Sequence, residues 1–308
     1  MSVKRIKIEN VGSVGEQSLE LSQLIYGVWR LAEDSDTSTA HTKRKIETCL
    51  ANGVTTFDHA DIYGDYSCEA LFGQVLKESP AMRSEMELIS KCGIGLISDK
   101  YPDRGVKLYD TSKSYIVQSV ENSLKHLNTD YLDVLLIHRP DPFMDVNDTA
   151  AALDHLVDSG KVLSVGVSNF ISYDWRLLQK HMKHQLVLNQ IELSVLHHSP
   201  LTDGTLSMMQ EDSMLATAWS SLAGGRLFGG DADALRVRHV LESIAKEHDC
   251  EIDAVALAWL LAHPANILPV IGTNKIERIA QAVKSVTVNL DRHQWFEIYT
   301  QALGHEVA

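Results

Sequence analysis

The chain has 308 residues, and 28 lysines and arginines against 41 aspartates and glutamates give a formal net charge of −13. This excess of acid argues against a nucleic-acid or anionic-membrane partner, because both are polyanions that require a basic surface. The longest apolar stretch, residues 255–262, is far shorter than the roughly 20 residues of a membrane-spanning helix. The N-terminus lacks the apolar segment of a signal peptide and the four cysteines are scattered, so we expect a reduced cytoplasmic protein.

Residues 3–21 predict an N-terminal β-hairpin. Residues 4–8 alternate between polar and apolar side chains, and Gly12 and Gly15 mark a turn before the apolar residues of 19–21. We expect this hairpin to cover one end of the main domain.

Eight short apolar runs follow, separated by segments with a helical period. Because these runs are nearly continuous and not alternating, they predict parallel strands buried on both faces. The runs cover residues 24–28, 55–58, 86–91, 134–138, 162–168, 186–190, 214–219 and 267–271.

The segments between the runs predict amphipathic helices, because apolar residues recur three and four positions apart. Gly53 and Gly160 stand where helices are expected to end, and Asp148 and Asp253 stand where N-caps are expected. Eight strands alternating with helices over about 250 residues is the count of a (β/α)8 TIM barrel. A doubly wound parallel sheet alternates in the same way, and periodicity alone does not separate the two. We expect one domain over 1–308, with the barrel at about 24–285 and a C-terminal tail at about 286–308.

Most of the predicted strands end in a polar or aromatic residue. Functional sites gather at the carboxyl ends of parallel strands in both candidate folds, so these side chains are expected to share one face. They are Asp58, Lys91, His138, Ser168, Asn169, Gln190, Trp219, Ser220, Gly272 and Thr273.

Four ionisable residues in this set and beside it suggest proton transfer. A lysine in a barrel mouth loses hydration and requires a carboxylate partner, and Asp58 is the obvious partner for Lys91. Tyr63 follows Asp58 by five residues and is expected at the same mouth, with His138. A nearby ammonium favours phenolate, so Lys91 is expected to lower the pKa of Tyr63. The set predicts a tuned proton donor suited to an oxyanion formed from a carbonyl.

Six motifs in order resemble those of the aldo-keto reductase superfamily, and they span residues 24–285. They are Asp58-x-Ala60-x-x-Tyr63-Gly64, Ile89-Ser90-Lys91-Cys92-Gly93, Leu135-Leu136-Ile137-His138, Gly166-Val167-Ser168-Asn169-Phe170, Asn189-Gln190-Ile191-Glu192 and Ile271-Gly272-Thr273. The longer strings at residues 59–64 and 138–142 are most similar to the bacterial YdhF-type branch. The resemblance favours the barrel over the doubly wound sheet.

The resemblance implies an NADP(H)-dependent oxidoreductase that reduces a small aldehyde or ketone. Carried over by position, Tyr63 is the general acid, Lys91 held by Asp58 tunes it, and His138 orients the substrate oxygen or assists proton transfer. Trp29 matches a position that lines the substrate pocket.

The remaining motif positions imply contacts with the cofactor. Ser168, Asn169 and Gln190 match the set that binds the carboxamide, and Trp219 stands where an aromatic side chain stacks on the nicotinamide. The positions matching the pyrophosphate loop and the 2′-phosphate site are Ser220, Ser221, Leu222, Gly225, Arg226, Gly272, Thr273, Asn274 and Arg278. Gln281 departs from the family's pattern at the adenine contacts. Arg226, Lys275 and Arg278 are expected to form a local basic patch on an acidic protein.

Other interpretations of the same residues remain open at this stage. The chain could be an NADP(H)-binding regulatory or interaction subunit with negligible turnover, since such family members can keep the four catalytic residues. It could also be an unrelated barrel enzyme that uses Lys91 as a Schiff-base amine. No spacing suggests a metal site, and a monomer is expected. The physiological substrate does not follow from the sequence.

Overall fold

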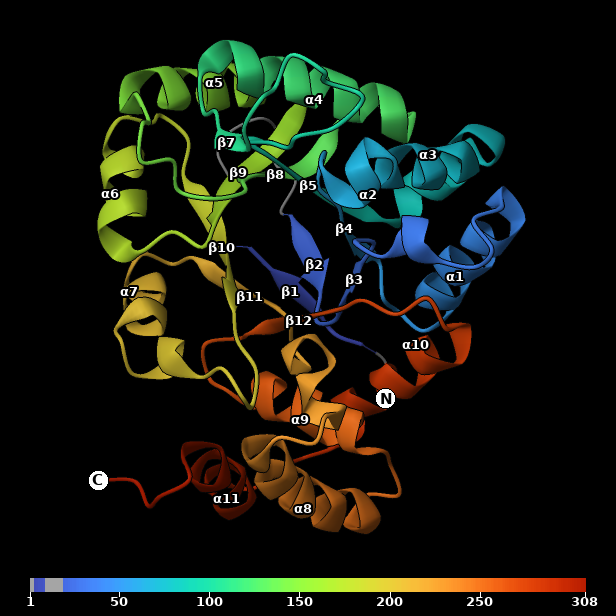
Figure 1. The fold of residues 1–308 in the computed structure, drawn as a ribbon, viewed down its shortest axis with the longest axis vertical. Helices are drawn as coiled ribbons and strands as arrows, with labels where there is room; N and C mark the ends of the chain where they lie inside the picture. Colours follow the sequence, from blue (N-terminus) through green and yellow to red (C-terminus); the bar gives the residue numbers. More distant parts are fainter. Residues whose placement is uncertain (1–2, 9–18) are drawn as a thin grey trace.

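The computed structural model describes residues 3–8 and 19–308 and contains a closed barrel of parallel strands (Figure 1). Its eight strands are β3 (Ile25–Gly27), β4 (Thr56–Asp58), β5 (Glu87–Cys92), β8 (Leu132–Ile137), β9 (Val162–Ser168), β10 (Leu186–Glu192), β11 (Leu215–Trp219) and β12 (Leu268–Ile271). Neighbouring strands pair in chain order, and β12 closes the ring on β3. Each predicted run therefore overlaps one strand, and the (β/α)8 barrel is confirmed over the doubly wound sheet.

Helices lie around the barrel or at its mouth (Figure 1). They are α1 (Thr39–Ala51), α2 (Tyr63–Tyr66), α3 (Cys68–Glu78), α4 (Lys113–Leu127), α5 (Val146–Asp158), α6 (Ser172–Lys180), α7 (Thr205–Glu211), α8 (Ala232–Glu247), α9 (Ile252–Leu261), α10 (Ile276–Val283) and α11 (Arg292–Leu303). The segment expected as a C-terminal tail thus carries a helix, α11, which packs against α8.

The helix boundaries confirm the two helix ends predicted at glycines and correct the two predicted N-caps. Gly53 and Gly160 follow the ends of α1 and α5 with φ of 78° and 72°, a conformation that glycine adopts without strain. The N-cap of α5 is Asp145, whose carboxylate accepts from two backbone N–H groups, whereas Asp148 lies in the first turn. Similarly, α9 is capped at Glu251, and Asp253 lies inside it. Both predictions were wrong because each helix begins before the chosen aspartate.

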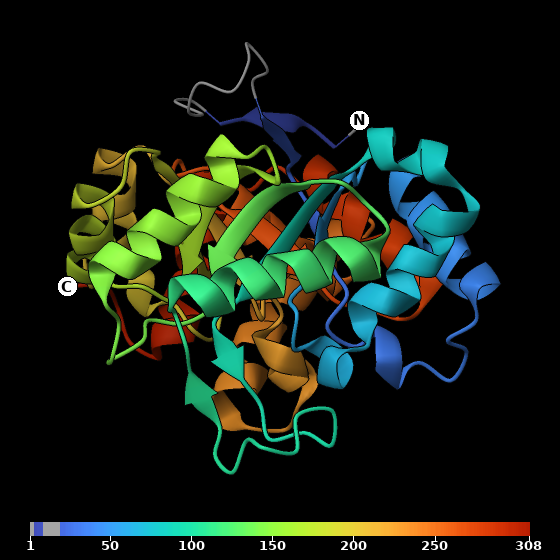
Figure 2. The same ribbon diagram turned by 90° about the horizontal axis from the view of Figure 1, so that it is seen from above.

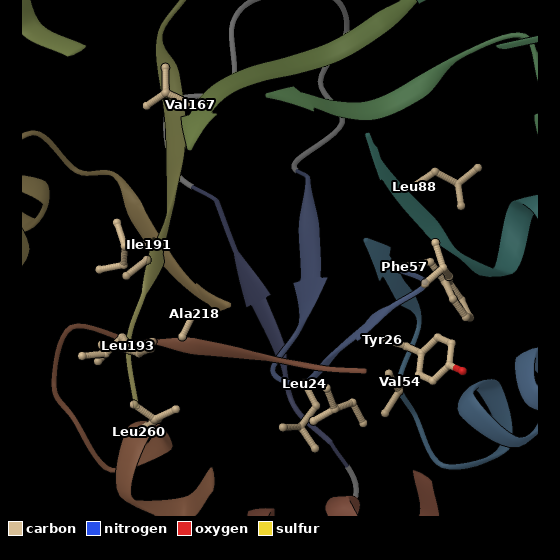
Figure 3. Close-up of a cluster of buried hydrophobic side chains, with 14 of the residues drawn as sticks. Leu24, Tyr26, Val54, Phe57, Leu88, Val167, Ile191, Leu193, Ala218 and Leu260 are labelled. Carbon is tan, nitrogen blue, oxygen red and sulfur yellow. The ribbon is translucent and has the colours of Figure 1, made fainter. Parts of the chain in front are cut away.

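Strand geometry divides the core into two layers. Successive side chains of a strand point to opposite faces, so each barrel strand contributes to both layers. The inner layer contains Ile25, Ile89, Val134, Leu136, Leu188 and Leu268. The outer layer packs between sheet and helices and includes Leu24, Tyr26, Phe57, Leu88 and Val167 (Figure 3).

The N-terminal hairpin covers one end of the barrel, and the functional strand ends lie at the other. β1 (Arg5–Lys7) pairs antiparallel with β2 (Glu20–Ser22), and Arg5 donates to Glu87 at the start of β5 at 2.7 Å. Leu19 and Leu21 extend the inner core, which seals this end. The hairpin is therefore confirmed; its predicted turn at residues 12 and 15 falls outside the described residues.

A second small sheet projects from the opposite end of the barrel (Figure 2). It pairs β6 (Ile94–Gly95) with β7 (Leu108–Tyr109) and belongs to the connection between β5 and α4. In the part of the chain that the structure describes, no helix is long and apolar enough to span a bilayer.

Candidate active site

A buried hydrogen-bond network centred on Lys91 occupies the carboxyl ends of β4 and β5. The Nζ of Lys91 lies 2.8 Å from the Asp58 carboxylate, 2.8 Å from the carbonyl oxygen of His59 and 2.9 Å from the Tyr63 hydroxyl. Lys91 is fully buried and the Asp58 side chain is only 4% exposed. Three oxygens thus use the three donors of the ammonium, which is how a buried cation is tolerated.

Strand parity explains why these side chains converge. Lys91 is two residues after the inward-facing Ile89, so it also points into the barrel. Asp58 points inward in the same way, because the preceding Phe57 packs in the outer layer. Tyr63 comes from the short α2 that follows β4, and its hydroxyl reaches Lys91 from above the strand ends.

The electrostatics of the network differ in one respect from the expectation. Burial raises the pKa of Tyr63 above its ordinary value, and the opposing effect of Lys91 does not cancel this. The predicted net lowering of the Tyr63 pKa is therefore wrong, because desolvation of the phenolate outweighs the ammonium. Burial alone would lower the pKa of Lys91, but Asp58 and Tyr63 raise it above its usual range. Lys91 thus stays charged and Tyr63 stays protonated at neutral pH.

His138 directly follows β8 and lies against Tyr63. The two rings meet edge to face, with their centroids 5.9 Å apart. Burial holds the pKa of His138 well below its ordinary value, and the charges of Lys91, Arg139 and Lys107 act in the same direction. His138 is therefore neutral at pH 7, and its imidazole can act as a hydrogen-bond donor.

Polar side chains at the carboxyl ends of β9, β10 and β11 form a chain of hydrogen bonds across the mouth. Trp219 donates its indole N–H to Asn169 at 2.9 Å, and Asn169 donates to the Ser168 hydroxyl at 2.8 Å. Ser168 donates in turn to the carbonyl oxygen of Gln190, whose side chain donates to Asp58 at 2.9 Å. The structure therefore brings these four residues together and links them to the Lys91 network.

The loop after β11 has an irregular backbone. Ser220, Ala223, Gly224 and Gly225 all have positive φ, so successive N–H groups are turned away from a regular helix. The side chains of Ser221 and Leu222 are buried or half-buried, and Ser221 donates to the carbonyl oxygen of Ala218.

Arg226, in the same loop, is held by acidic neighbours. Its guanidinium lies 3.1 Å from Asp231 and 3.2 Å from Asp233, and all three side chains are exposed. Its charge is therefore partly neutralised within its own loop, which the sequence pattern did not indicate.

The segment after β12 places the remaining predicted contacts on an accessible surface. Gly272, Lys275, Arg278 and Gln281 are exposed, and Thr273 is half-buried. Asn274 instead joins two other elements: its side chain accepts from Lys45 at 3.1 Å and donates to the Arg30 carbonyl oxygen at 2.6 Å. Asn274 therefore holds this loop against the connection after β3.

Trp29 lies after β3 and is 55% exposed, with the Arg30 guanidinium 5.2 Å from its ring. This exposure excludes a place in the core, and the pocket role of Trp29 stays a prediction. Arg139, which was not predicted, stands 5.4 Å over the ring of Trp219. Its position directly after His138 was the only signal in the sequence. Within the described ranges, no group of three or more His, Cys, Asp or Glu side chains is arranged to hold a metal ion.

A closed parallel barrel with a polar network at the carboxyl ends of its strands has the architecture of a barrel enzyme. The family model for the Aldo/keto reductase family matches residues 23–300. The chain belongs to this family.

Two curated relatives and one solved structure are similar to the chain over nearly its whole length. The chain is 50% identical over 290 residues to 6-dehydroglucose reductase from Agrobacterium fabrum, covering 94% of this chain and 97% of that protein. It is 44% identical over 296 residues to oxidoreductase YdhF from Escherichia coli, covering 96% and 98%, which confirms the predicted resemblance. An aldo/keto reductase from Klebsiella pneumoniae, crystallised with NADP and acetate, shares the fold with a TM-score of 0.74, 24% identity and 94% coverage of both chains.

Proposed function

We propose that the protein is an NADP(H)-dependent reductase of aldehydes or ketones in which Tyr63 donates the proton. The observation that carries this proposal is the 2.9 Å contact between the Tyr63 hydroxyl and the buried, charged Lys91. When bound, the reduced nicotinamide supplies the hydride.

The residues of the chain supply the proton and stabilise the charge that remains. Because burial keeps Tyr63 protonated at neutral pH, its hydroxyl can donate to the carbonyl oxygen as that oxygen gains negative charge. The resulting phenolate lies beside the Lys91 ammonium, which stabilises it. The neutral His138 orients the carbonyl oxygen toward Tyr63 through a ring N–H.

The chemistry of the strand-end side chains fits a dinucleotide. The amides of Asn169 and Gln190 provide both donors and acceptors for a carboxamide, and the Trp219 ring offers a stacking face. The positive-φ backbone at residues 223–225 suits a pyrophosphate. Thr273, Lys275 and Arg278 would hold the 2′-phosphate, which favours NADP over NAD.

The substrate class to test first is a sugar aldehyde. The 50% identical relative is a 6-dehydroglucose reductase. The exposed face of Trp29 and the guanidinium of Arg139 provide an apolar ring and several N–H donors, which suit the two faces of a polyhydroxylated substrate.

The test is turnover of NADPH with 6-dehydroglucose and with simple aldehydes, in the wild type and in Tyr63→Phe. Turnover is expected to fall by about 10²–10⁴-fold in the variant while NADPH binding stays unchanged, because only the proton donor is lost. Tyr131→Phe is the matched control, since Tyr131 precedes β8 at the opposite end of the barrel. Full activity of Tyr63→Phe would sink the assignment.

Two other functions can be distinguished from the proposed reductase. The raised pKa of Lys91 disfavours a Schiff-base enzyme, because a charged ammonium is no nucleophile. Tight NADPH binding without turnover of any carbonyl, together with a stoichiometric protein partner, would instead indicate a regulatory subunit.

A further inference from the structure

The backbone that follows Tyr63 is strained. Gly64, Asp65 and Tyr66 have φ of 58°, 50° and 61°, so three consecutive residues adopt the left-handed conformation. Residues with a side chain rarely adopt it, and never as a run without support from surrounding structure. Gly64 itself cannot be replaced, because a Cβ there would lie 2.6 Å from the Cβ of Ala32. Contacts from elsewhere in the fold must therefore hold Asp65 and Tyr66.

Arg104 provides such a contact from the segment between β6 and β7. Its guanidinium lies 3.9 Å from the ring centroid of Tyr101, 5.5 Å from that of Tyr115 and 6.0 Å from that of Tyr66. Its Nη1 also donates to the Tyr66 hydroxyl at 2.8 Å, and the backbone N–H of Leu96 donates to the same oxygen at 2.9 Å. One side chain thus joins three tyrosine rings from three separate segments. We call Arg104, Tyr66, Tyr101 and Tyr115 the arginine cage.

A second attachment runs parallel to the first. Lys100, from the same segment, donates to the carbonyl oxygen of Asp65 at 2.5 Å. The base of the segment is fixed in turn, because Tyr115 of α4 donates to the carbonyl oxygen of Ile94 at 2.9 Å. The segment that projects from the catalytic end of the barrel therefore grips two of the three left-handed residues (Figure 2).

On its inner side, the arginine cage borders a cavity of about 100 Å³. Asp61, Glu69 and Ser119 line this cavity together with the cage. Among the described residues, Tyr66 therefore has no packed side chain on the side of the cavity, and the cage and the Leu96 N–H hold its ring. Lysine could not replace Arg104, because its compact ammonium lacks the planar group that stacks on the tyrosine rings and donates hydrogen bonds in a fixed plane.

We propose that Arg104 is a positioning residue that fixes Tyr63 for proton transfer by holding the left-handed residues that follow it. This rests on the proposed function, in which Tyr63 is the proton donor. Tyr63 is the first residue of α2, so a change in the following backbone moves its ring relative to Lys91 and His138. Arg104 acts through Tyr63 and contacts none of the reacting atoms.

The experiment compares kcat, KM and NADPH affinity in Arg104→Ala, Arg104→Lys and Tyr66→Phe. We expect kcat to fall by about 10–100-fold in the first two and less in Tyr66→Phe, since misplacement of a catalytic group costs rate. NADPH affinity is expected to stay within about twofold. Tyr101→Phe is the matched control: it keeps the ring against Arg104 and is expected to leave kcat unchanged, whereas Tyr101→Leu lowers it.

Two further readouts separate positioning from a loss of stability. Burial raises the pKa of Tyr63 and Lys91 lowers it, so a displaced Tyr63 changes this balance and should shift the alkaline limb of the kcat profile. Arg83→Lys disturbs a similar arginine–tyrosine pair, 4.0 Å from Tyr131, at the other end of the barrel and should leave this limb in place. The double variant Arg104→Ala with Tyr63→Phe should be no slower than Tyr63→Phe alone.

The outcomes distinguish the two proposals. If Tyr63→Phe is inactive but both Arg104 variants keep kcat within twofold and an unchanged alkaline limb, the positioning role is refuted alone. Additive losses in the double variant, or an equal loss of kcat in Arg83→Lys, also refute it. Full activity of Tyr63→Phe overturns the proton-donor assignment and, with it, this inference. If Arg104→Ala does not fold, Arg104→Lys and Tyr66→Phe carry the same test.

Discussion

Replacing Asp58 with asparagine tests whether charge holds the buried network together. The substitution preserves size, and an amide oxygen can still accept one hydrogen bond, but the negative charge beside Lys91 is lost. No other group replaces the lost charge, because the remaining partners of Lys91 are the neutral Tyr63 hydroxyl and the carbonyl oxygen of His59. An ammonium without a counter-charge is then left in the interior of the barrel.

The magnitude follows from the cost of a buried charge that has lost its partner. Removing one member of a buried ion pair typically destabilises a protein by about 3–5 kcal/mol. Asp58 and the Tyr63 hydroxyl raise the pKa of Lys91 against the effect of burial, so burial should lower the pKa below about 10.4 once the carboxylate is removed. Between that lowered value and about 10.4, the unfolded chain binds more protons than the folded variant, so stability of the variant rises with pH.

The assay is urea unfolding of wild type and Asp58→Asn between pH 7 and pH 9.5. The variant is expected to be less stable by about 3 kcal/mol at pH 7, with the gap narrowing as pH rises. Glu121→Gln is the control, because Glu121 pairs with Lys161 on the exposed surface and should show little change at any pH. A gap for Asp58→Asn that is small, or constant with pH, would refute the reasoning.

Three further substitutions test other parts of the site. Burial raises the pKa of Asp61 to about 7, so the stability of the wild type falls as pH rises from about 4 to 7. In urea unfolding, Asp61→Asn should be more stable than the wild type by about 1–3 kcal/mol at pH 8 and equally stable near pH 4. Burial lowers the pKa of His59 to about 3, so the wild type loses stability as pH falls below about 6.5. In an acid titration, His59→Leu should unfold at a lower pH than the wild type, and an unchanged midpoint would contradict this. Arg278→Ala should weaken NADPH binding at least about tenfold more than NADH binding in calorimetric titrations, and equal losses would refute the 2′-phosphate assignment.

The eight parallel strands were predictable because they are buried on both faces, which leaves continuous apolar runs in the sequence. The choice of a barrel over a doubly wound sheet rested on the family resemblance, because both folds leave the same runs. The positions of Asp58, Lys91 and His138 at one end of the barrel were predictable, because strand parity and strand ends fix where such side chains lie. Lys91 and Asp58 face inward on neighbouring strands, and the sequence needs only the strand assignment to place them.

Features that depend on how deeply a group is buried, or on contacts between segments far apart in the sequence, were not predictable. The net pKa shift of Tyr63 is set by how completely the hydroxyl is buried, which spacing does not show. Arg226 was assigned to the phosphate, but the structure also pairs it with Asp231, because loop geometry decides which charges meet. The arginine cage joins residues from three segments, and no local pattern announces it.

The hydrogen bonds at the mouth hold the predicted carboxamide-binding side chains in place without using up their capacity. Gln190 donates one of its two amide hydrogens to Asp58, which leaves the second hydrogen and the oxygen. Asn169 is fixed at both ends, by Trp219 and Ser168, yet each amide atom has a further site. Because these side chains are ordered when the protein folds, their rotamer entropy is not lost again on ligand binding. The network around Lys91 therefore also preorganises the proposed cofactor site, because Asp58 contacts both Lys91 and Gln190.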